Sequence, residues 1–553
     1  MRNRKKDNSG FMLQGIILAA AGIITRIIGL IYRIPLNGII GDNGYYTKAY
    51  DIYSMALVIS SYSLPIAVSK LVSAKIAMGE EKNAFRIFLS ALLFALVSGG
   101  IITSVLFFGA DVIATSFMSS PLTAIALRTL SPALFIVAIL GVVRGYFQGR
   151  GTMMPTAISQ ILEQIMNALI SILAAIRFLE EGKKMALSED NPLLEPAYAA
   201  AGGTLGTVLG AGIALLFMLF IFAMYARLLK QKIKRDRRSR KESYLVLFKN
   251  LFLIILPIII ATAVYNMSQT IDAAVFGKIM GAQGVPEAQT EEMLGVFGMK
   301  YLTLINIPLA IANALGASAM PSITAAFERG ERRLVIGKMR STIRFIMQIA
   351  IPSAMGFFVL SSAIMQLIFG DARPLPANML RLGAISVVFF SLSTMTNALL
   401  QGVNKFTVPI KNALISLGVH LVILVIMLAG FKLNVYGLVI GNIIFSLSMC
   451  VLNTQSLKKA VKYRQEVKKT FVIPSIAAIL MGVLSFGFYT LLDIFLNVRI
   501  AAVLSLPVAV IIYASALLKL GGLSEDEILT IPKGAFLLQL FRKLHLLPRN
   551  FQY

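Results

Sequence analysis

The sequence has few of the residues that support disulfides, metal centres and redox chemistry. It contains one cysteine, two histidines and no tryptophan among 553 residues. The single cysteine, Cys450, excludes an intramolecular disulfide framework, and His420 and His545 are too far apart in the sequence to suggest a metal motif. The catalytic patterns HExxH, CxxC and GxSxG are also missing. We therefore expect no metal, no cofactor and no enzymatic activity.

Charged residues are scarce as well. They make up 14% of the chain against 57% hydrophobic residues, and the mean hydropathy is +0.79, a balance that excludes a soluble globular protein. Most apolar runs approach the length of about 20 residues that a helix needs to cross a bilayer. We predict an all-α polytopic membrane protein with fourteen transmembrane helices, at residues 11–31, 52–74, 84–108, 124–146, 157–178, 197–225, 247–277, 294–320, 342–369, 377–400, 408–429, 435–457, 472–492 and 500–519.

The net charge of +26 comes from basic residues that lie between the apolar runs. The segment KQKIKRDRRSRKE, 230–242, is strongly basic, whereas 180–195 is mainly acidic. With the amino terminus MRNRKK inside the cell, the basic loops fall on the cytoplasmic side, as the positive-inside rule requires. This distribution predicts two cytoplasmic termini and argues against a nucleic-acid partner. The first apolar run is too long for a cleavable signal peptide, so we expect it to be retained.

The two halves of the chain resemble each other. SLPIAVSKLVSAKIAMGEEKNAFR, from Ser63, pairs with AMPSITAAFERGERRLVIGKMRST, from Ala319, and Gln148-Gly149 pairs with Gln401-Gly402 at nearly the same offset. Each repeat holds six spans, so the halves enter the membrane in the same orientation and enclose a cleft. We predict a pseudo-two-fold pair of six-helix lobes at 1–229 and 244–457, a basic cytoplasmic interlobe linker at 230–243, a basic loop and two further helices at 458–519, and a cytoplasmic amphipathic tail at 520–553.

Two arginines interrupt the first apolar run, in ITRIIGLIYRIP. An arginine at the centre of a bilayer costs roughly 2.5 to 3.5 kcal/mol on insertion scales. Arg26 and Arg33 are seven residues apart and leave the same helix face. In a water-filled cleft, a guanidinium keeps its charge and offers a fork matched to phosphate. Two other interpretations stay open: a buried ion pair for Arg26, and snorkelling of Arg33 to the interface. Pro35 should bend or end the helix just beyond.

Four further charges lie within predicted spans. Lys70 and Lys300 are candidate cleft cations, whereas Glu163 and Asp272 either neutralise these cations or bind a coupling ion. The excess of cations suits an anionic substrate such as a diphosphate. The run GGTLGTVLGAG, from Gly202, has small residues at four-residue spacing and predicts close helix packing; it lacks the Gly-Lys-Ser/Thr pattern of a phosphate loop.

The segment TRIIGLIYRIPLNGIIGDNGYYTKAYDIYSM, followed by LPIAVSKLVS, resembles the amino-terminal signature of the MurJ/MviN and stage V sporulation protein B branch of the MOP exporter superfamily. The resemblance extends over nearly the whole chain. It implies two lobes that alternate access around a central cationic cavity, which receives the diphosphate of an undecaprenyl-linked saccharide, and a groove for the lipid tail at the last two helices. It also implies an essential arginine at Arg26 and a further basic position at Arg33. Where the family has an arginine in span 8, this sequence has Thr303, with Lys300 one turn earlier.

These observations favour a flippase that moves lipid II, or a related cell-wall or polysaccharide precursor, from the inner to the outer leaflet of a bacterial cell membrane. We expect a monomer whose substrate contacts include Arg26, Arg33, Lys70 and Lys300. Whether Na⁺, H⁺ or the membrane potential drives transport is left open. The alternative is a MATE-like antiporter for organic cations, which would require a cleft dominated by carboxylates; a membrane glycosyltransferase would require an acidic catalytic cluster that is not evident.

Overall fold

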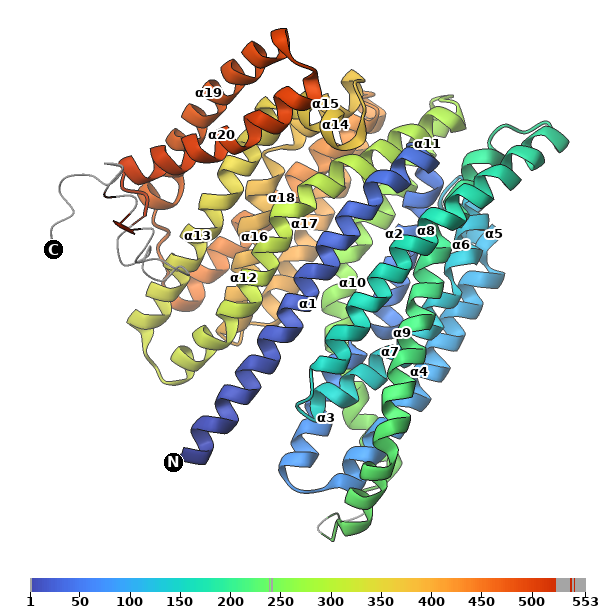
Figure 1. Ribbon diagram of the computed structural model, residues 1–553, viewed down its shortest axis with the longest axis vertical. Coiled ribbons are helices and arrows are strands. Elements are labelled where there is room, and N and C mark those ends of the chain that lie inside the picture. Colours follow the sequence, from blue (N-terminus) through green and yellow to red (C-terminus); the bar gives the residue numbers. More distant parts are fainter. Residues whose placement is uncertain (1, 238, 240–241, 524–537, 540–541, 543–553) are drawn as a thin grey trace. The chain divides into compact units, whose positions relative to one another are not determined.

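The computed structural model describes residues 2–237, 239, 242–523, 538–539 and 542 (Figure 1). Every helix or strand assigned over these residues is a helix. Twelve helices are long and apolar enough to cross a membrane, and the bent pair α15 (Pro374–Gly383) and α16 (Ser386–Gly402), with an angle of 44°, makes a thirteenth candidate. This confirms the predicted all-α polytopic class. The predicted span at 247–277 lies in the continuous helix α10 (Tyr244–Ala282), and the count of fourteen stays a prediction.

The chain divides into two compact units, residues 1–299 and 300–553, which we call unit 1 and unit 2. Because α10 and α11 pack on α2, and α10 also packs on α4, both belong to unit 1. The sequence repeat and the compact units therefore divide the chain at different points. Unit 1 contains α1 (Arg2–Ile40), α2 (Gly44–Leu57), π-helix η1 (Val58–Tyr62), α3 (Leu64–Ala77), α4 (Glu81–Phe108), α5 (Ala110–Val112), π-helix η2 (Ile113–Phe117), α6 (Thr123–Leu130), α7 (Pro132–Gly149), α8 (Met154–Ser188), α9 (Leu194–Arg235), α10 and α11 (Glu287–Gly295).

Small residues let the long helices α8 and α9 of unit 1 run side by side (Figure 1). A Cβ atom on Gly202 or Gly206 would meet the backbone of α8, and one on Gly210 would lie 2.7 Å from the carbonyl oxygen of Glu163. The close packing predicted from the four-residue spacing is therefore confirmed. Helix α1 continues through Pro35 to Ile40, so the proline does not end the helix.

Unit 2 starts at the end of the π-helix η3 (Val296–Tyr301), which spans the boundary between the units. Its last two membrane helices form a hairpin against α13, where the Gln348 amide donates to the Gly522 carbonyl at 2.8 Å and the Tyr513 hydroxyl donates to the Gln348 carbonyl at 2.8 Å. The predicted tail at 520–553 lies mostly outside the described residues. Beyond η3, α15 and α16, unit 2 contains α12 (Leu302–Glu328), α13 (Arg332–Val359), α14 (Ser361–Phe369), α17 (Thr407–Val425), π-helix η4 (Ile426–Gly430), α18 (Val435–Val461), π-helix η5 (Lys468–Val472), α19 (Ile473–Phe495) and α20 (Val498–Lys519).

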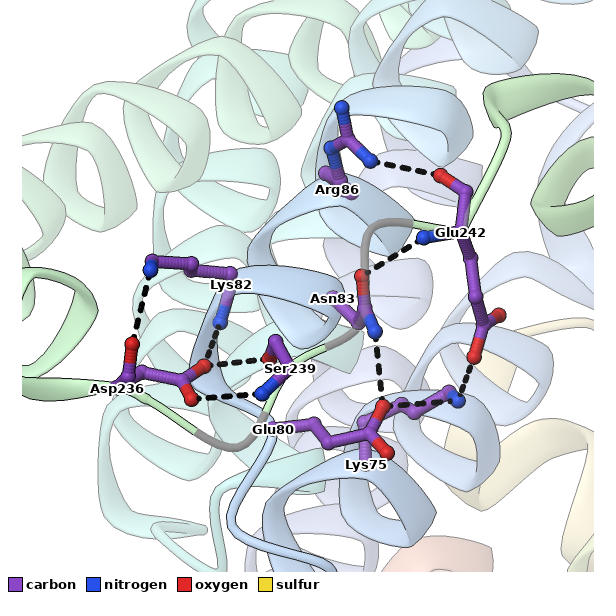
Figure 2. Close-up of polar contacts among 8 residues, drawn as sticks. All are labelled: Lys75, Glu80, Lys82, Asn83, Arg86, Asp236, Ser239 and Glu242. Carbon is purple, nitrogen blue, oxygen red and sulfur yellow. Dashed lines mark hydrogen bonds and ion pairs between the residues drawn. The ribbon is translucent and has the colours of Figure 1, made fainter.

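Asp236 fastens the first part of the basic linker to the start of α4 (Figure 2). Its carboxylate accepts the backbone N–H of Lys82 at 2.8 Å, which is one of the N–H groups that a helix start leaves without an internal partner. The Lys82 ammonium in turn donates to the Asp236 carbonyl at 2.8 Å. The same carboxylate accepts the backbone N–H and the hydroxyl of Ser239, at 3.0 and 2.5 Å. One aspartate thus shapes the linker and caps a helix of unit 1.

Glu242 fastens the other end of the linker, just before α10 (Figure 2). Its carboxylate pairs with Lys75, and its carbonyl accepts from Arg86 at 2.7 Å. Lys75 also pairs with Glu80 at 3.0 Å. Gly79, with a φ of 78°, makes the left-handed turn after α3 that places Glu80 there. Hydrogen bonds from Asn83 and Lys75 hold the pKa of Glu80 below its usual value. Both acids of the linker are therefore bound to unit 1.

Replacing Asp236 with alanine should expose the linker to trypsin. The charge-assisted hydrogen bonds that would be lost are worth roughly 1.5 to 3 kcal/mol each, so the local opening equilibrium should rise about tenfold or more. The rate of cleavage within 236–243 by limited trypsin digestion measures this. Glu189→Ala, which removes an exposed acid elsewhere in unit 1, serves as the control. An unchanged cleavage rate in Asp236→Ala would show that the contacts do not restrain the linker.

Candidate functional site

The two predicted arginines of α1 differ in their surroundings. Arg26 is exposed at the surface of unit 1, where a ligand can reach it, whereas Arg33 is half-buried. Gly29 lies between them, and a Cβ on this residue would come within 3.1 Å of the Gln164 amide of α8. The glycine therefore lets a polar side chain of α8 approach α1 beside the arginines.

Tyrosines surround Arg33. Its guanidinium donates to the Tyr32 hydroxyl and lies close to Tyr46 and Tyr50 of α2. The rings of Tyr46 and Tyr50 are 4.6 Å apart between centroids, and that of Tyr53 follows 6.0 Å from Tyr50. Within the part of the chain that the structure describes, the groups found beside the guanidinium are these tyrosines. Arg33 therefore keeps the positive charge that an anionic ligand requires.

A polar network continues from the tyrosines into the α8–α9 hairpin. The Tyr50 hydroxyl hydrogen-bonds the Thr207 hydroxyl, which donates to the Asn167 side-chain carbonyl at 3.4 Å. The Ser171 hydroxyl donates to the same carbonyl at 3.0 Å and to the Gly203 backbone carbonyl at 2.8 Å. Because apolar surroundings make unpaired polar groups costly, this network holds α2, α8 and α9 in a defined arrangement around Arg33.

Glu163 pairs with a cation that the sequence analysis did not single out. Arg144 of α7 donates to the Glu163 carboxylate at 2.8 Å, and its Nε donates to the Ser159 hydroxyl at 2.9 Å. Glu163 therefore pairs with Arg144, whereas the sequence analysis expected it to neutralise Lys70 or Lys300 or to bind a coupling ion. Arg144 lies inside the predicted fourth span, so the cost of burying an arginine was the signal that could have found it.

Asp272 is buried on α10, with 5% of its surface exposed. It interacts electrostatically with Asp51 of α2. The two helices are also joined here by the Thr270 hydroxyl, which donates to the Asp51 carbonyl at 3.0 Å. Asp51 and Asp272 therefore interact across the contact between α2 and α10 inside unit 1.

The two lysines of α3 differ in their exposure and in their contacts. Lys70, a predicted substrate contact, is exposed. Lys75 is half-buried in the ion pairs with Glu80 and Glu242 that hold the linker. Lys70 therefore remains accessible for a ligand at the surface of unit 1.

Lys300 is the one predicted substrate contact in unit 2. It is buried, and its ammonium pairs with the Asp371 carboxylate at 2.5 Å. Gly370, with a φ of 67°, ends α14 in a left-handed turn that brings Asp371 to this position. Arg373 donates to the same carboxylate at 2.6 Å. Burial alone would raise the pKa of Asp371, but the hydrogen bonds from Arg373 and Lys300 outweigh it and hold the pKa well below its usual range.

A second buried ion pair, Lys48 with Glu291, was missed by the sequence analysis. Lys48 is fully buried in α2, and its ammonium donates to the Glu291 carboxylate of α11. Nearby, the Tyr45 hydroxyl donates to the Glu287 carboxylate at 3.1 Å. A Cβ on Gly44 would meet Glu291, so α2 and α11 are in close contact. The predicted second span began at residue 52, which left Lys48 in a presumed loop, but α2 begins at Gly44.

Removing the positive charge of Lys48 by substitution should strongly destabilise unit 1. Lys48→Met leaves Glu291 buried without its cation, at a cost of about 3–5 kcal/mol, and should lower the melting temperature followed by circular dichroism in detergent. Lys48→Met/Glu291→Met removes both charges and should recover most of the loss. Lys184→Met removes a lysine from an exposed pair with Glu181 and should change stability by less than about 1 kcal/mol. Equal melting temperatures for Lys48→Met and Lys184→Met would contradict the importance of the buried pair.

The Asp371 carboxylate should make unit 2 sensitive to acid. Since its pKa in the folded protein lies below the value of about 3.9 for a free aspartate, it stabilises the fold above that value, and this contribution is lost as the pH falls through the folded-state pKa. Between about pH 5 and about pH 2, the wild type should therefore lose more stability than Asp371→Asn. Asp190→Asn, at an exposed position, should keep the wild-type slope. The measurement is the melting temperature against pH, and parallel slopes for wild type and Asp371→Asn would oppose the assignment.

The chain shares its fold with solved membrane transporters. It is similar to a structure of the Lipid II flippase MurJ in an inward closed conformation, with 13% identity and a TM-score of 0.65, over 96% of this chain and 99% of that chain. It is also similar to an inward-facing multidrug resistance MATE family transporter of the MOP superfamily, with 15% identity and a TM-score of 0.63, over 79% of this chain and 94% of that chain.

Two relatives from Bacillus subtilis (strain 168) match most of the sequence. The Stage V sporulation protein B is 25% identical over 467 residues, which cover 83% of this chain and 86% of the relative. The Lipid II flippase MurJ is 27% identical over 429 residues, which cover 75% of this chain and 77% of the relative.

The sequence model of one family, described as Polysaccharide biosynthesis protein, matches residues 12–327, more than half of the chain. The match begins before the two arginines of α1 and includes all of α11 and η3. Because the match covers more than half of the chain, this protein belongs to the family described as Polysaccharide biosynthesis protein.

Proposed function

We propose that the protein is a flippase that moves an undecaprenyl-diphosphate-linked saccharide, lipid II or a related cell-wall or polysaccharide precursor, from the inner to the outer leaflet by alternating access. The observation that carries this proposal is the pair of α1 arginines. Arg33 is oriented by tyrosines and Arg26 is exposed beside it on the same helix. The name of one relative, the Lipid II flippase MurJ, supports the same class of substrate.

The diphosphate of such a carrier suits this arrangement chemically. A guanidinium forms paired, charge-assisted hydrogen bonds with phosphate oxygens. The tyrosine hydroxyls and the amide of Gln164, which lie near the arginines, offer further hydrogen bonds to phosphate or sugar oxygens. Arg26 is the first contact in this proposal, with Arg33 behind it and Lys70 at the surface of α3.

Lys300 takes a different part in the proposal. It is already paired with Asp371, so a diphosphate that binds it must compete with that carboxylate. Thr303, at the place of the family's arginine, is also buried. We therefore expect Lys300 to contribute less to substrate affinity than Arg26.

Transport against a gradient of substrate needs a driving force, and the Asp51–Asp272 pair is our candidate for coupling. A proton or Na⁺ bound between the two carboxylates would relieve their repulsion. Glu163, by contrast, is neutralised by Arg144 and serves to balance charge. The membrane potential is the alternative driving force.

The alternative function is that of a MATE-like cation-coupled antiporter for small molecules. The similarity to the MATE fold and the interacting carboxylates of Asp51 and Asp272 favour it. The positive charge of Arg33 favours the anionic lipid instead, because it would repel an organic cation. Increased sensitivity to cationic dyes on deletion, without accumulation of a lipid-linked precursor, would support the antiporter.

Sidedness follows from the charge pattern. In the proposed orientation the basic linker faces the cytoplasm of a bacterial cell and both termini lie on that side. The substrate is a lipid-linked saccharide in the bilayer, the protein acts as a monomer, and it performs transport without bond-making chemistry. Identifying the undecaprenyl-linked intermediate that accumulates on the inner leaflet after depletion of the protein would name the saccharide.

Replacing the α1 arginines should reduce transport. Arg26→Ala removes a charge-assisted contact worth about 1.5–3 kcal/mol, so lipid II flipping in proteoliposomes should fall by roughly tenfold or more. Arg26→Lys should recover part of the rate because the charge remains. The matched control is Arg177→Ala, at an exposed arginine of α8 that pairs with Glu180 and Glu181. If Arg26→Ala and Arg33→Ala both retained the wild-type flipping rate, the proposed mechanism would be wrong.

A further inference from the structure

The segment that joins α18 to α19 in unit 2 is strongly basic. Residues 458–469, KKAVKYRQEVKK, contain six lysines and arginines and one acid, Glu466. Because this segment lies between two candidate membrane spans, Val435–Val461 and Lys468–Phe495, its charge stands where the chain leaves and re-enters the membrane. The proposed transport makes no use of it. The exposed cations of the segment are Lys458, Lys459, Lys462, Arg464 and Lys468.

Two buried hydroxyls lie within the same stretch of chain. Lys462 ends α18 in a left-handed conformation, with a φ of 54°, and the next residue, Tyr463, has only 2% of its surface exposed. Thr470 of η5, which packs on α13 and α19, is fully buried. Neither hydroxyl has a hydrogen-bond partner among the described residues. Since a buried polar group without a partner is costly, these hydroxyls suit a ligand that accepts hydrogen bonds.

Two arginines of α13 act on Tyr463. Arg340 and Arg344 are four residues apart and share a helix face. Burial raises the pKa of Tyr463 to about 12, while these two guanidinium groups oppose the shift and Glu466 adds to it. Arg344 pairs with the Glu466 carboxylate, to which its Nε donates at 3.1 Å, and Arg340 is exposed. The Tyr463 hydroxyl therefore lies in cationic surroundings that one carboxylate only partly offsets.

An exposed apolar stripe begins where the basic segment ends. Its residues follow one another at spacings of four, three and four, which put them on one helix face, and each has at least 44% of its surface exposed: Val472, Ile476, Ile479 and Val483. On a membrane helix such a face contacts acyl chains. A ligand beside this stripe would meet cations at one end and an apolar surface along its length, which fits a phospholipid better than a free phosphate ion.

We propose that residues 458–469 and the amino-terminal part of α13 form a binding site for an anionic phospholipid of the membrane. In this site the phosphodiester accepts hydrogen bonds from the Tyr463 hydroxyl and from the guanidinium groups of Arg340 and Arg344. The surrounding lysines attract the negative headgroup, and an acyl chain lies along the stripe of α19. Phosphatidylglycerol has the required charge, whereas zwitterionic phosphatidylcholine lacks it.

The absence of tryptophan from the chain permits a clean fluorescence test. Val472→Trp, at an exposed position beside the basic segment, gives the full-length protein a single tryptophan. The protein is reconstituted in vesicles that mix phosphatidylglycerol with phosphatidylcholine, with brominated chains on one lipid or on the other. Quenching of the tryptophan measures the relative affinity for the two lipids at this place. We expect a preference for phosphatidylglycerol of roughly fivefold or more, because one basic residue at an anionic surface contributes about that factor.

Two substitutions distinguish a specific site from a general attraction. Arg340→Gln and Tyr463→Phe should each lower the preference about threefold or more, since each removes a hydrogen bond to the phosphodiester. Tyr463→Phe removes no charge, so a general attraction would leave its preference unchanged. The controls are Lys405→Gln, at an exposed lysine elsewhere in unit 2, and Tyr436→Phe, at the opposite end of α18. Both should keep the wild-type preference.

Thermal stability gives a second readout and detects variants that fail to fold. In phosphatidylcholine vesicles, Tyr463→Phe should melt at or above the wild-type temperature, because it removes a buried hydroxyl without a partner among the described residues. Added phosphatidylglycerol should raise the melting temperature of the wild type more than that of the variant, since it binds the folded wild type more tightly. Equal increases in the two proteins would contradict the site.

Three further results would overturn the proposal. The first is equal quenching by the two brominated lipids, and the second is a preference that survives either Arg340→Gln or Tyr463→Phe. The third is displacement of brominated phosphatidylglycerol by inorganic phosphate or by undecaprenyl diphosphate, which would assign the site to a free anion or to the transported lipid. The flipping assay is independent of this outcome, because a protein that flips lipid II without preferring phosphatidylglycerol here keeps the flippase and loses the site.

Discussion

A charge inside a membrane protein must find a partner, because the hydrocarbon offers none. This constraint organises both units. Lys48 is paired with Glu291, Arg144 with Glu163, and Lys300 with Asp371. The first pair joins α2 to α11, the second joins the consecutive helices α7 and α8, and the third joins η3 to the turn after α14, so these pairs contribute to the packing of the segments that carry them. Among the described residues, Arg33 differs from these three cations because the groups beside its guanidinium are tyrosines.

Glycine residues help to set the positions of these charged residues. The left-handed turns at Gly79 and Gly370 end helices and present Glu80 and Asp371 to their lysines. Elsewhere glycine acts by its size, as at Gly206 between α9 and α8 or Gly295 against the backbone after α1. The packing of the helices in each unit therefore depends both on these ion pairs and on the close backbone contacts at glycine.

Composition and periodicity were enough to predict the helical membrane fold, because spans of apolar residues depend on local sequence alone. The same holds for the α8–α9 packing, which follows from regularly spaced small residues. Arg26 and Arg33 were found because an arginine in an apolar run is costly. Arg144 met the same criterion and was overlooked, and Lys48 was hidden by a helix start placed eight residues too late.

The ion-pair partners of these charged residues could not be predicted from a single sequence. Nothing local connects Lys48 with Glu291 or Lys300 with Asp371, since each pairing depends on how separate helices pack. The tyrosines around Arg33 could not be assigned from the sequence either. A tyrosine has an apolar ring and a polar hydroxyl, so it occurs both in buried cores and in binding sites. The substrate contacts remain predictions for that reason.

The linker contacts have a consequence for how the architecture relates to the predicted repeat. The predicted repeat places the join between its two halves in the basic segment before α10. The contacts of Asp236 and Glu242 close that join, and the compact units separate some sixty residues later. The segment that joins the predicted repeats therefore lies inside unit 1, which also contains α10 and α11, so unit 1 holds more of the chain than the first predicted lobe.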